Sequence, residues 1–359
     1  EDEAKTVAVE QAISNIHGPI TSIVRESGAN LAEHAGLLAI EKLIIENSGE
    51  NYADLGANAV LPVSRALWKA AAALHNQELS QYINANETEL ASDGTVGFLM
   101  NIFNGGLHAL KDGETLGEDR IDIQEIMVVP SAPTYAEALE MGDKIDFALK
   151  GILTEKFSAE VLTRADEAGF SVKGLGSSTE AFGYVFEAIR AAGYEPGKDV
   201  KLALDVAAAS FYNAETKTYQ FQGKSISSQE MVDYLVGLVD KYEGCMLSIE
   251  DGLDENDWDF WPVLTAELTK RDVVTIGDDL FVTQLPRLEK GIATKAATAI
   301  LVKVNQNGSM SGTFDVMKRA RSAGMKCVIS HRSGETLDAS IADIAYATGS
   351  MGLKTGDPQ

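Results

Sequence analysis

The chain has 359 residues, of which 45% are hydrophobic and 23% are charged, a composition typical of a globular protein with a buried core. Asp and Glu outnumber Lys and Arg by 54 to 30, which gives a formal net charge of −24. A surface with this charge repels phosphate backbones and anionic lipids, so we expect neither a nucleic-acid partner nor a membrane partner. The sequence contains no long apolar run and no signal-peptide pattern, so we expect a cytoplasmic location.

Residues 1–92 predict a small, mainly helical domain. Apolar residues recur at helical spacing over residues 4–20 and 30–45, and a third helix is expected to start within 56–64 and to reach Leu74. The polar stretch 77–93 predicts a loop or linker, which places the domain boundary between residues 92 and 93. Because the chain starts at Glu1 rather than Met, we expect native sequence to be missing at one or both ends.

From Gly97 onwards, apolar strands alternate with helical segments. Strands are predicted at 98–103, 125–129, 202–206, 246–249, 273–276, 299–304 and 327–330. This alternation predicts a parallel α/β barrel of the TIM type over residues 93–359. The polar residues gather where the strands end, which is where barrel enzymes carry their catalytic groups.

Three acidic residues, Asp205, Glu250 and Asp278, follow three separate predicted strands. Each of them alone is more typical of a helix N-cap. Three carboxylates at the mouth of one barrel, however, form a set of hard oxygen ligands that suits Mg²⁺. The sequence therefore predicts a magnesium site.

Two lysines and one polar segment also follow strands. Lys303 ends the strand at 299–304, and a lysine whose pKa falls beside divalent cations can act as a general base. Lys354 is a second cation at the last strand of the barrel. The segment Ser330-His331-Arg332-Ser333-Gly334-Glu335-Thr336 offers a guanidinium and hydroxyl donors, which favour binding of an anionic, phosphorylated ligand.

Several motifs resemble the enolase (phosphopyruvate hydratase) family, in the family's order and over nearly the whole chain. They are Gly56-Ala57-Asn58-Ala59, Phe103-Asn104-Gly105-Gly106-Leu107-His108, Leu204-Asp205-Val206-Ala207-Ala208, Ser248-Ile249-Glu250-Asp251, Gly277-Asp278-Asp279-Leu280-Phe281-Val282-Thr283, Leu301-Val302-Lys303-Val304-Asn305-Gln306-Asn307-Gly308-Ser309, the segment from Ser330 to Thr336, and Gly352-Leu353-Lys354-Thr355-Gly356.

The resemblance implies a small α+β domain, of which the helical part is present at 1–92, followed by an eight-stranded enolase barrel at 93–359. It implies that two Mg²⁺ ions act with a phosphorylated or phosphono carboxylate substrate, the second ion binding together with that substrate. It also implies a homo-oligomer, either a dimer or an assembly of dimers.

The resemblance further assigns roles to individual residues of this chain. Asp205, Glu250 and Asp278 would bind the first ion, which chelates the substrate carboxylate. Lys303 would remove the proton at C2, and Lys354 would neutralise the carboxylate of the resulting dianion. Arg332 and Ser333 would bind the phosphate. His108, Glu125 and His331 match substrate-side residues, and Glu125 and His331 also count as candidate catalytic groups.

The sequence departs from the family at the loop Gly-Asp-Glu-Gly-Gly, whose glutamic acid helps hydroxide to leave. We align this loop with residues 172–177, where Leu175 falls at the position of the acid and no carboxylate is present. Three interpretations stay open: a divergent phosphopyruvate hydratase that interconverts 2-phosphoglycerate and phosphoenolpyruvate; a relative with altered chemistry, similar to carboxyphosphonoenolpyruvate synthase; and a non-catalytic scaffold.

Overall fold

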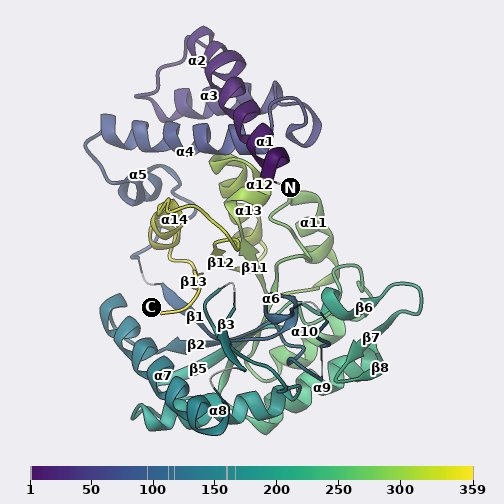
Figure 1. Ribbon diagram of the computed structural model, residues 1–359. Helices are drawn as coiled ribbons and strands as arrows, with labels where there is room; N and C mark the ends of the chain where they lie inside the picture. The colour runs from purple at the N-terminus through teal and green to yellow at the C-terminus, as the bar shows by residue number, and fades with distance from the viewer. Residues whose placement is uncertain are drawn as a thin grey trace.

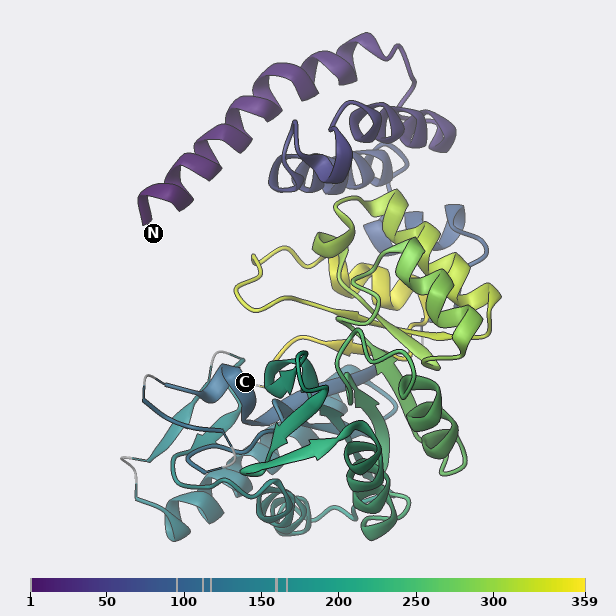
Figure 2. The same ribbon diagram turned by 90° about the vertical axis from the view of Figure 1, so that its right-hand side faces the viewer.

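The computed structural model describes residues 2–94, 96–111, 113–116, 118–158, 161–165 and 167–358, and side chains from residue 8 onwards. A layer of helices lies at one end of the molecule and a barrel at the other (Figures 1 and 2). The helical layer consists of α1 (Asp2–Asn15), η1 (Ile16–Ile20), α2 (Thr21–Glu26), α3 (His34–Glu46), η2 (Glu50–Tyr52), α4 (Ala57–Leu74) and α5 (Leu79–Asn86).

The helical layer differs from the prediction in two places. The first helix does not stop at residue 20, because the π-helical turn η1 accommodates Pro19 and the chain continues into α2. The stretch predicted as a linker contains α5, which buries Leu79, Tyr82 and Ile83 and starts with a capping box. The division of the chain between residues 92 and 93 stays a prediction.

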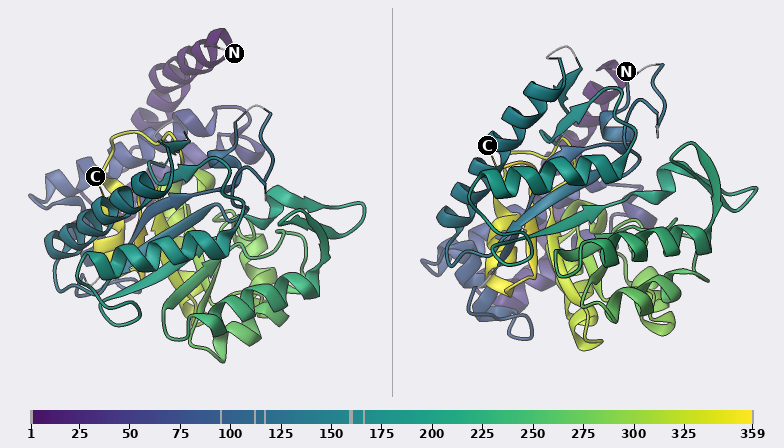
Figure 3. Two further views of the ribbon diagram at one scale, coloured as in Figure 1. Left: turned by 60° about the horizontal axis from the view of Figure 1, so that its bottom comes forward. Right: turned by 90° about the horizontal axis from the view of Figure 1, so that it is seen from below.

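Eight strands close into a barrel, as predicted, because the last strand pairs with the first. In the order in which they pair, these strands are β1 (Gly97–Asn104), β2 (Glu125–Pro130), β5 (Val200–Asp205), β9 (Met246–Glu250), β10 (Val274–Gly277), β11 (Ala299–Val302), β12 (Lys326–Ser330) and β13 (Gly352–Lys354). Figure 3 shows the barrel end of the molecule with helices packed outside the strands.

The expectation of a fully parallel barrel is wrong at one strand. β2 runs antiparallel to both β1 and β5, whereas the other neighbours are parallel. In the described part of residues 105–124, which connect β1 to β2, the one helix is the four-residue α6 (Gly106–Ala109), whereas parallel strands are usually joined by a longer crossover helix. β2 ends far from the barrel mouth at which the other strands end, and β5 starts at that same far end because the two strands are antiparallel. The two long helices between β2 and β5 therefore lead the chain back to the end at which β2 finished. The start of β2 therefore lies at the same mouth as the ends of the other strands.

The remaining elements cover the barrel or decorate its ends. The long outer helices are α7 (Tyr135–Lys156), α8 (Ser178–Ala191), α9 (Ser228–Lys241), α10 (Trp261–Thr269), α11 (Leu285–Thr294), α13 (Met310–Ser322) and α14 (Ser340–Thr348). The short elements are β3 (Leu162–Arg164), β4 (Phe170–Val172), η3 (Ala208–Phe211), β6 (Tyr212–Asn213), β7 (Thr218–Phe221), β8 (Lys224–Ser227) and α12 (Val304–Asn307). Within the described ranges, no helix combines the length and apolar character needed to cross a membrane.

Buried Glu41 on α3 joins the helical layer to the barrel. Its carboxylate accepts hydrogen bonds from Ser64 and from the indole Nε1 of Trp68 on α4, the latter at 3.1 Å. It also accepts from the backbone N–H groups of Met310, at 3.1 Å, and Ser311, at 3.3 Å, in the first turn of α13. A carboxylate at a helix N-terminus satisfies unpaired N–H groups and interacts favourably with the helix dipole. Glu41 thereby fixes the helical layer against the barrel.

Candidate active site

The three carboxylates predicted to bind magnesium come together at the barrel mouth. Asp205 and Glu250 are paired in register at the ends of neighbouring strands β5 and β9, and Asp278 follows the next strand, β10. All three are buried. Burial raises the pKa of Glu250, and the nearby carboxylate of Asp205 raises it further. Such a group needs a cation to remain ionised.

Two lysines supply positive charge to these carboxylates. The Nζ of Lys354 lies 3.0 Å from Asp205 Oδ2, 3.0 Å from Glu250 Oε1 and 3.1 Å from Glu125 Oε2. Lys303 Nζ donates to Asp278 Oδ2 at 2.5 Å. Burial disfavours the charged form of both lysines, but the facing carboxylates outweigh it and raise the pKa of each. The sequence predicted a lowered pKa for Lys303. In this structure a lowered pKa requires a bound cation that replaces Lys303 as the partner of Asp278.

The donor set fits a divalent ion. One buried oxygen of Glu250, Oε2, has no hydrogen-bond partner within the described part of the chain. The neighbouring Asp251 is a less suitable ligand although its carboxylate lies within 4.8 Å of those of Asp278 and Asp279. Both oxygens of Asp251 already accept backbone N–H groups, of Asp278 at 3.0 Å and of Asp279 at 2.7 Å. Asp251 thus holds the loop that carries Asp278, while Asp205, Glu250 and Asp278 are the residues that could hold Mg²⁺.

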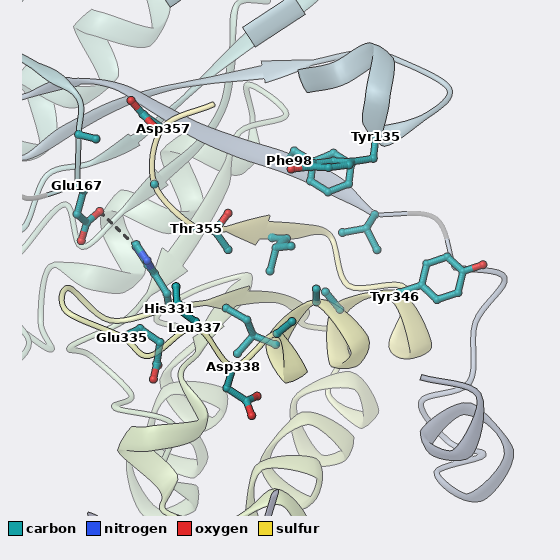
Figure 4. A pocket seen from close by; sticks show the side chains of 18 of the residues that line it. Phe98, Tyr135, Glu167, His331, Glu335, Leu337, Asp338, Tyr346, Thr355 and Asp357 are labelled. Atoms are coloured by element: carbon teal, nitrogen blue, oxygen red, sulfur yellow. Dashed lines mark ion pairs between the residues drawn. The ribbon is translucent and has the colours of Figure 1, made fainter. Parts of the chain in front are cut away.

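A further carboxylate, missed in the sequence, lies on the other side of the mouth. Glu167 is buried in the turn between β3 and β4, which is closed by a hydrogen bond from Ala165 N–H to the Gly169 carbonyl at 3.0 Å. β4 pairs with β1 and so brings the turn to the site. Ser333 Oγ donates to Glu167 Oε1 at 2.8 Å, and His331 Nε2 lies 3.5 Å from Glu167 Oε2 (Figure 4).

Glu167 and Glu125 form a coupled pair of carboxyl groups. Burial raises the pKa of Glu125, and the neighbouring Glu167 raises it further against the opposing effect of Lys354. Burial acts in the same direction on Glu167, but hydrogen bonding to Glu125 and His331 outweighs it and lowers the pKa of Glu167. Two buried carboxyl groups in contact share a proton rather than ionise together. The pair can therefore hold one proton at the edge of the site.

The alignment that placed Leu175 at the acid position is wrong. Leu175 is buried in the hydrophobic core and is not part of the site. Residues 165–169, with the sequence Ala-Asp-Glu-Ala-Gly, instead have the Asp-Glu order of the family loop, with alanine at two of its glycine positions. Ala168 adopts a left-handed backbone with φ of 62°, a conformation that favours glycine. The consecutive Asp and Glu at 166–167, followed by Gly169, are the sequence feature that could have identified Glu167 as the acid.

His108, like His331 and Ser333, lies beside the same pair of carboxyl groups. His108 Nδ1 lies 3.8 Å from Glu167 and 4.0 Å from Glu125. Arg332 is exposed, and among the described residues its guanidinium has no ion-pair partner, so it is available for an anion. Glu167 and His331 lie at one end of a cavity of about 1060 Å³, with Phe98, Tyr135 and Tyr346 towards the other end (Figure 4). The carboxylates of Asp205, Glu250 and Asp278 and the two lysines lie outside the lining of this cavity.

A family model described as "Enolase, C-terminal TIM barrel domain" matches residues 96–359. The matched segment includes all eight barrel strands and all the site residues described above.

Proposed function

The chain belongs to the enolase family, which makes it an enzyme of the lyase or isomerase type, and we propose that it interconverts 2-phosphoglycerate and phosphoenolpyruvate with Mg²⁺. The observation that carries the proposal is the placement of a base and an acid pair across the barrel mouth. Lys303 follows β11, and Glu125 starts β2, which is the strand diametrically opposite in the closed order of eight. Elimination of water needs such an arrangement, since a proton leaves one carbon and hydroxide leaves the next.

In the proposed reaction, Lys303 takes the C2 proton of 2-phosphoglycerate. The electron pair of the broken C–H bond forms the new double bond, and the C3–O bond breaks. The Glu125–Glu167 pair gives its proton to the departing hydroxide, so water and phosphoenolpyruvate are the products. When bound by Asp205, Glu250 and Asp278, Mg²⁺ would supply positive charge to the substrate carboxylate, where negative charge develops.

The other residues serve substrate binding in this proposal. Arg332 and Ser333 bind the phosphate, and Lys354 faces the carboxylate once a metal ion has replaced it among the acidic groups. His331 and His108 lie against the acid pair and orient its proton. Arg332 is exposed, and it directly precedes Ser333, whose hydroxyl donates to Glu167. These two features support phosphate binding at this edge.

The altered-substrate alternative was based on the absence of a catalytic acid. Because Glu167 can serve as that acid, this reason no longer holds. The non-catalytic alternative is disfavoured by the buried charges, because a scaffold would be more stable with apolar groups in their place. The test is conversion of 2-phosphoglycerate by the purified protein with Mg²⁺, followed by the absorbance of phosphoenolpyruvate. Turnover supports the proposal. Exchange of the C2 proton without turnover would point to altered chemistry, and neither turnover nor Mg²⁺ binding would point to a scaffold.

A further inference from the structure

The ammonium group of Lys354 occupies the position where a cation would contact the acidic groups. Its Nζ is within 3.1 Å of oxygens from Asp205, Glu250 and Glu125, and only 5% of the side chain is exposed. Lys303 makes the equivalent contact with Asp278, at 2.5 Å. Each of the three carboxylates proposed as metal ligands is therefore already paired with a lysine of the same chain.

The lysine contacts oppose the binding of a metal ion. A divalent ion binds carboxylate oxygens at 2.0–2.6 Å, and it would share Asp205, Glu250 and Asp278 with two ammonium groups, although Oε2 of Glu250 has no hydrogen-bond partner within the described residues. Two cations this close repel each other strongly in a buried site.

We propose that Lys354 and Lys303 compete with the divalent ion for Asp205, Glu250 and Asp278, so that the ion binds more weakly than it would without the two ammonium groups. Lys354 is the stronger competitor, because it contacts two of the three ligands and Lys303 contacts one. The inference rests on the proposed function for the identity of the metal ligands. Beyond that function, the inference states that the two ammonium groups lower the Mg²⁺ affinity of the site below that of three buried carboxylates without lysine partners.

Titration of the full chain with Mg²⁺ in the absence of substrate tests this competition. The wild type, Lys354→Met and the matched control Lys326→Met are freed of metal with a chelator and compared by calorimetry. Lys326 lies at the exposed start of the neighbouring strand β12, at the opposite end of the barrel, and its substitution changes the net charge equally. We expect Lys354→Met to bind Mg²⁺ at least about tenfold more tightly than the wild type. Lys326→Met should differ by less than about twofold, because an exposed and distant charge is screened.

The melting temperature gives a second readout. Lys354→Met should melt below the wild type in chelator, because three carboxylates are left without their cation, and this difference should shrink at saturating Mg²⁺. If Lys354→Met does not fold in chelator, Lys303→Met carries the same test, with a smaller gain in affinity expected. Equal or weaker Mg²⁺ binding by the variant that folds would overturn the inference while leaving the proposed function intact. A wild type that binds no Mg²⁺ would instead overturn both.

Discussion

Replacement of Glu167 by Gln tests the assignment of the acid. The substitution keeps the size of a buried side chain that accepts a hydrogen bond from Ser333 at 2.8 Å and contacts His331 at 3.5 Å. It removes one member of the carboxyl pair, so the proton can no longer be shared with Glu125. A positioned acid contributes about 10²–10⁴-fold, and we expect the kcat for dehydration of 2-phosphoglycerate to fall by that factor. The fall corresponds to about 2.7–5.4 kcal/mol in the activation free energy.

Proton exchange at C2 separates this effect from general damage to the site. Lys303 lies across the mouth and does not contact Glu167, so E167Q should still exchange the C2 proton of 2-phosphoglycerate with D₂O in the presence of Mg²⁺, as followed by NMR. The control is Glu195→Gln, an exposed glutamate before β5 at the opposite end of the barrel, which should leave both rates unchanged. Dehydration by E167Q at a rate close to that of the wild type would refute the assignment.

Three further substitutions probe the turn, the loop and a buried acid. A Cβ on Gly169 would lie 2.3 Å from Asn104 Oδ1, so G169A should displace the β3–β4 turn and lower kcat at least about tenfold; an unchanged kcat would contradict this. Lys69 Nζ binds Asp338 at 2.7 Å in the loop before α14. Because exposed ion pairs contribute about 0.2–1 kcal/mol, K69M should raise KM by about 1.4- to fivefold at low salt, with kcat unchanged. A KM equal to that of the wild type would exclude a role for this pair. Burial raises the pKa of Asp122 to about 6, so the folded state keeps a proton that the unfolded chain releases, and stability is lost as the pH rises from about 4 to about 6. D122N should remove this loss and raise the free energy of unfolding at pH 8 by up to about 3 kcal/mol. Urea unfolding curves that show the same pH dependence as the wild type would refute this expectation.

Local patterns were sufficient to predict seven of the eight barrel strands and the residues that directly follow them. Asp205, Glu250 and Lys303 each end an apolar run, and the end of a strand in a closed barrel lies at the mouth whatever the loops do. The direction of β2 was missed because a strand has the same alternation of side chains in either direction. The reversal is set by how residues 105–124 connect the two strands, which the strand pattern itself does not specify.

Glu167 was missed for a related reason. Its position depends on the pairing of β4 with β1, which joins Phe170 to Phe103 across 67 residues, and no local pattern in a turn specifies such a contact. The family's glycine-rich signature was also weakened, because Ala168 takes the left-handed conformation that glycine adopts without strain. The helix α5 was missed because its buried face has only three apolar residues in a polar stretch.

The site as a whole balances its charges differently on its two sides. On the β5–β9–β10 side, the buried carboxylates are paired with Lys354 and Lys303, so that side stays charged. On the side of β2 and the β3–β4 turn, Glu125 and Glu167 face each other with histidines at 3.5–4.0 Å, and a shared proton reduces their charge. A substrate between them would meet concentrated positive charge at one end and a proton donor at the other. That asymmetry is what proton abstraction next to a carboxylate, followed by departure of hydroxide, requires.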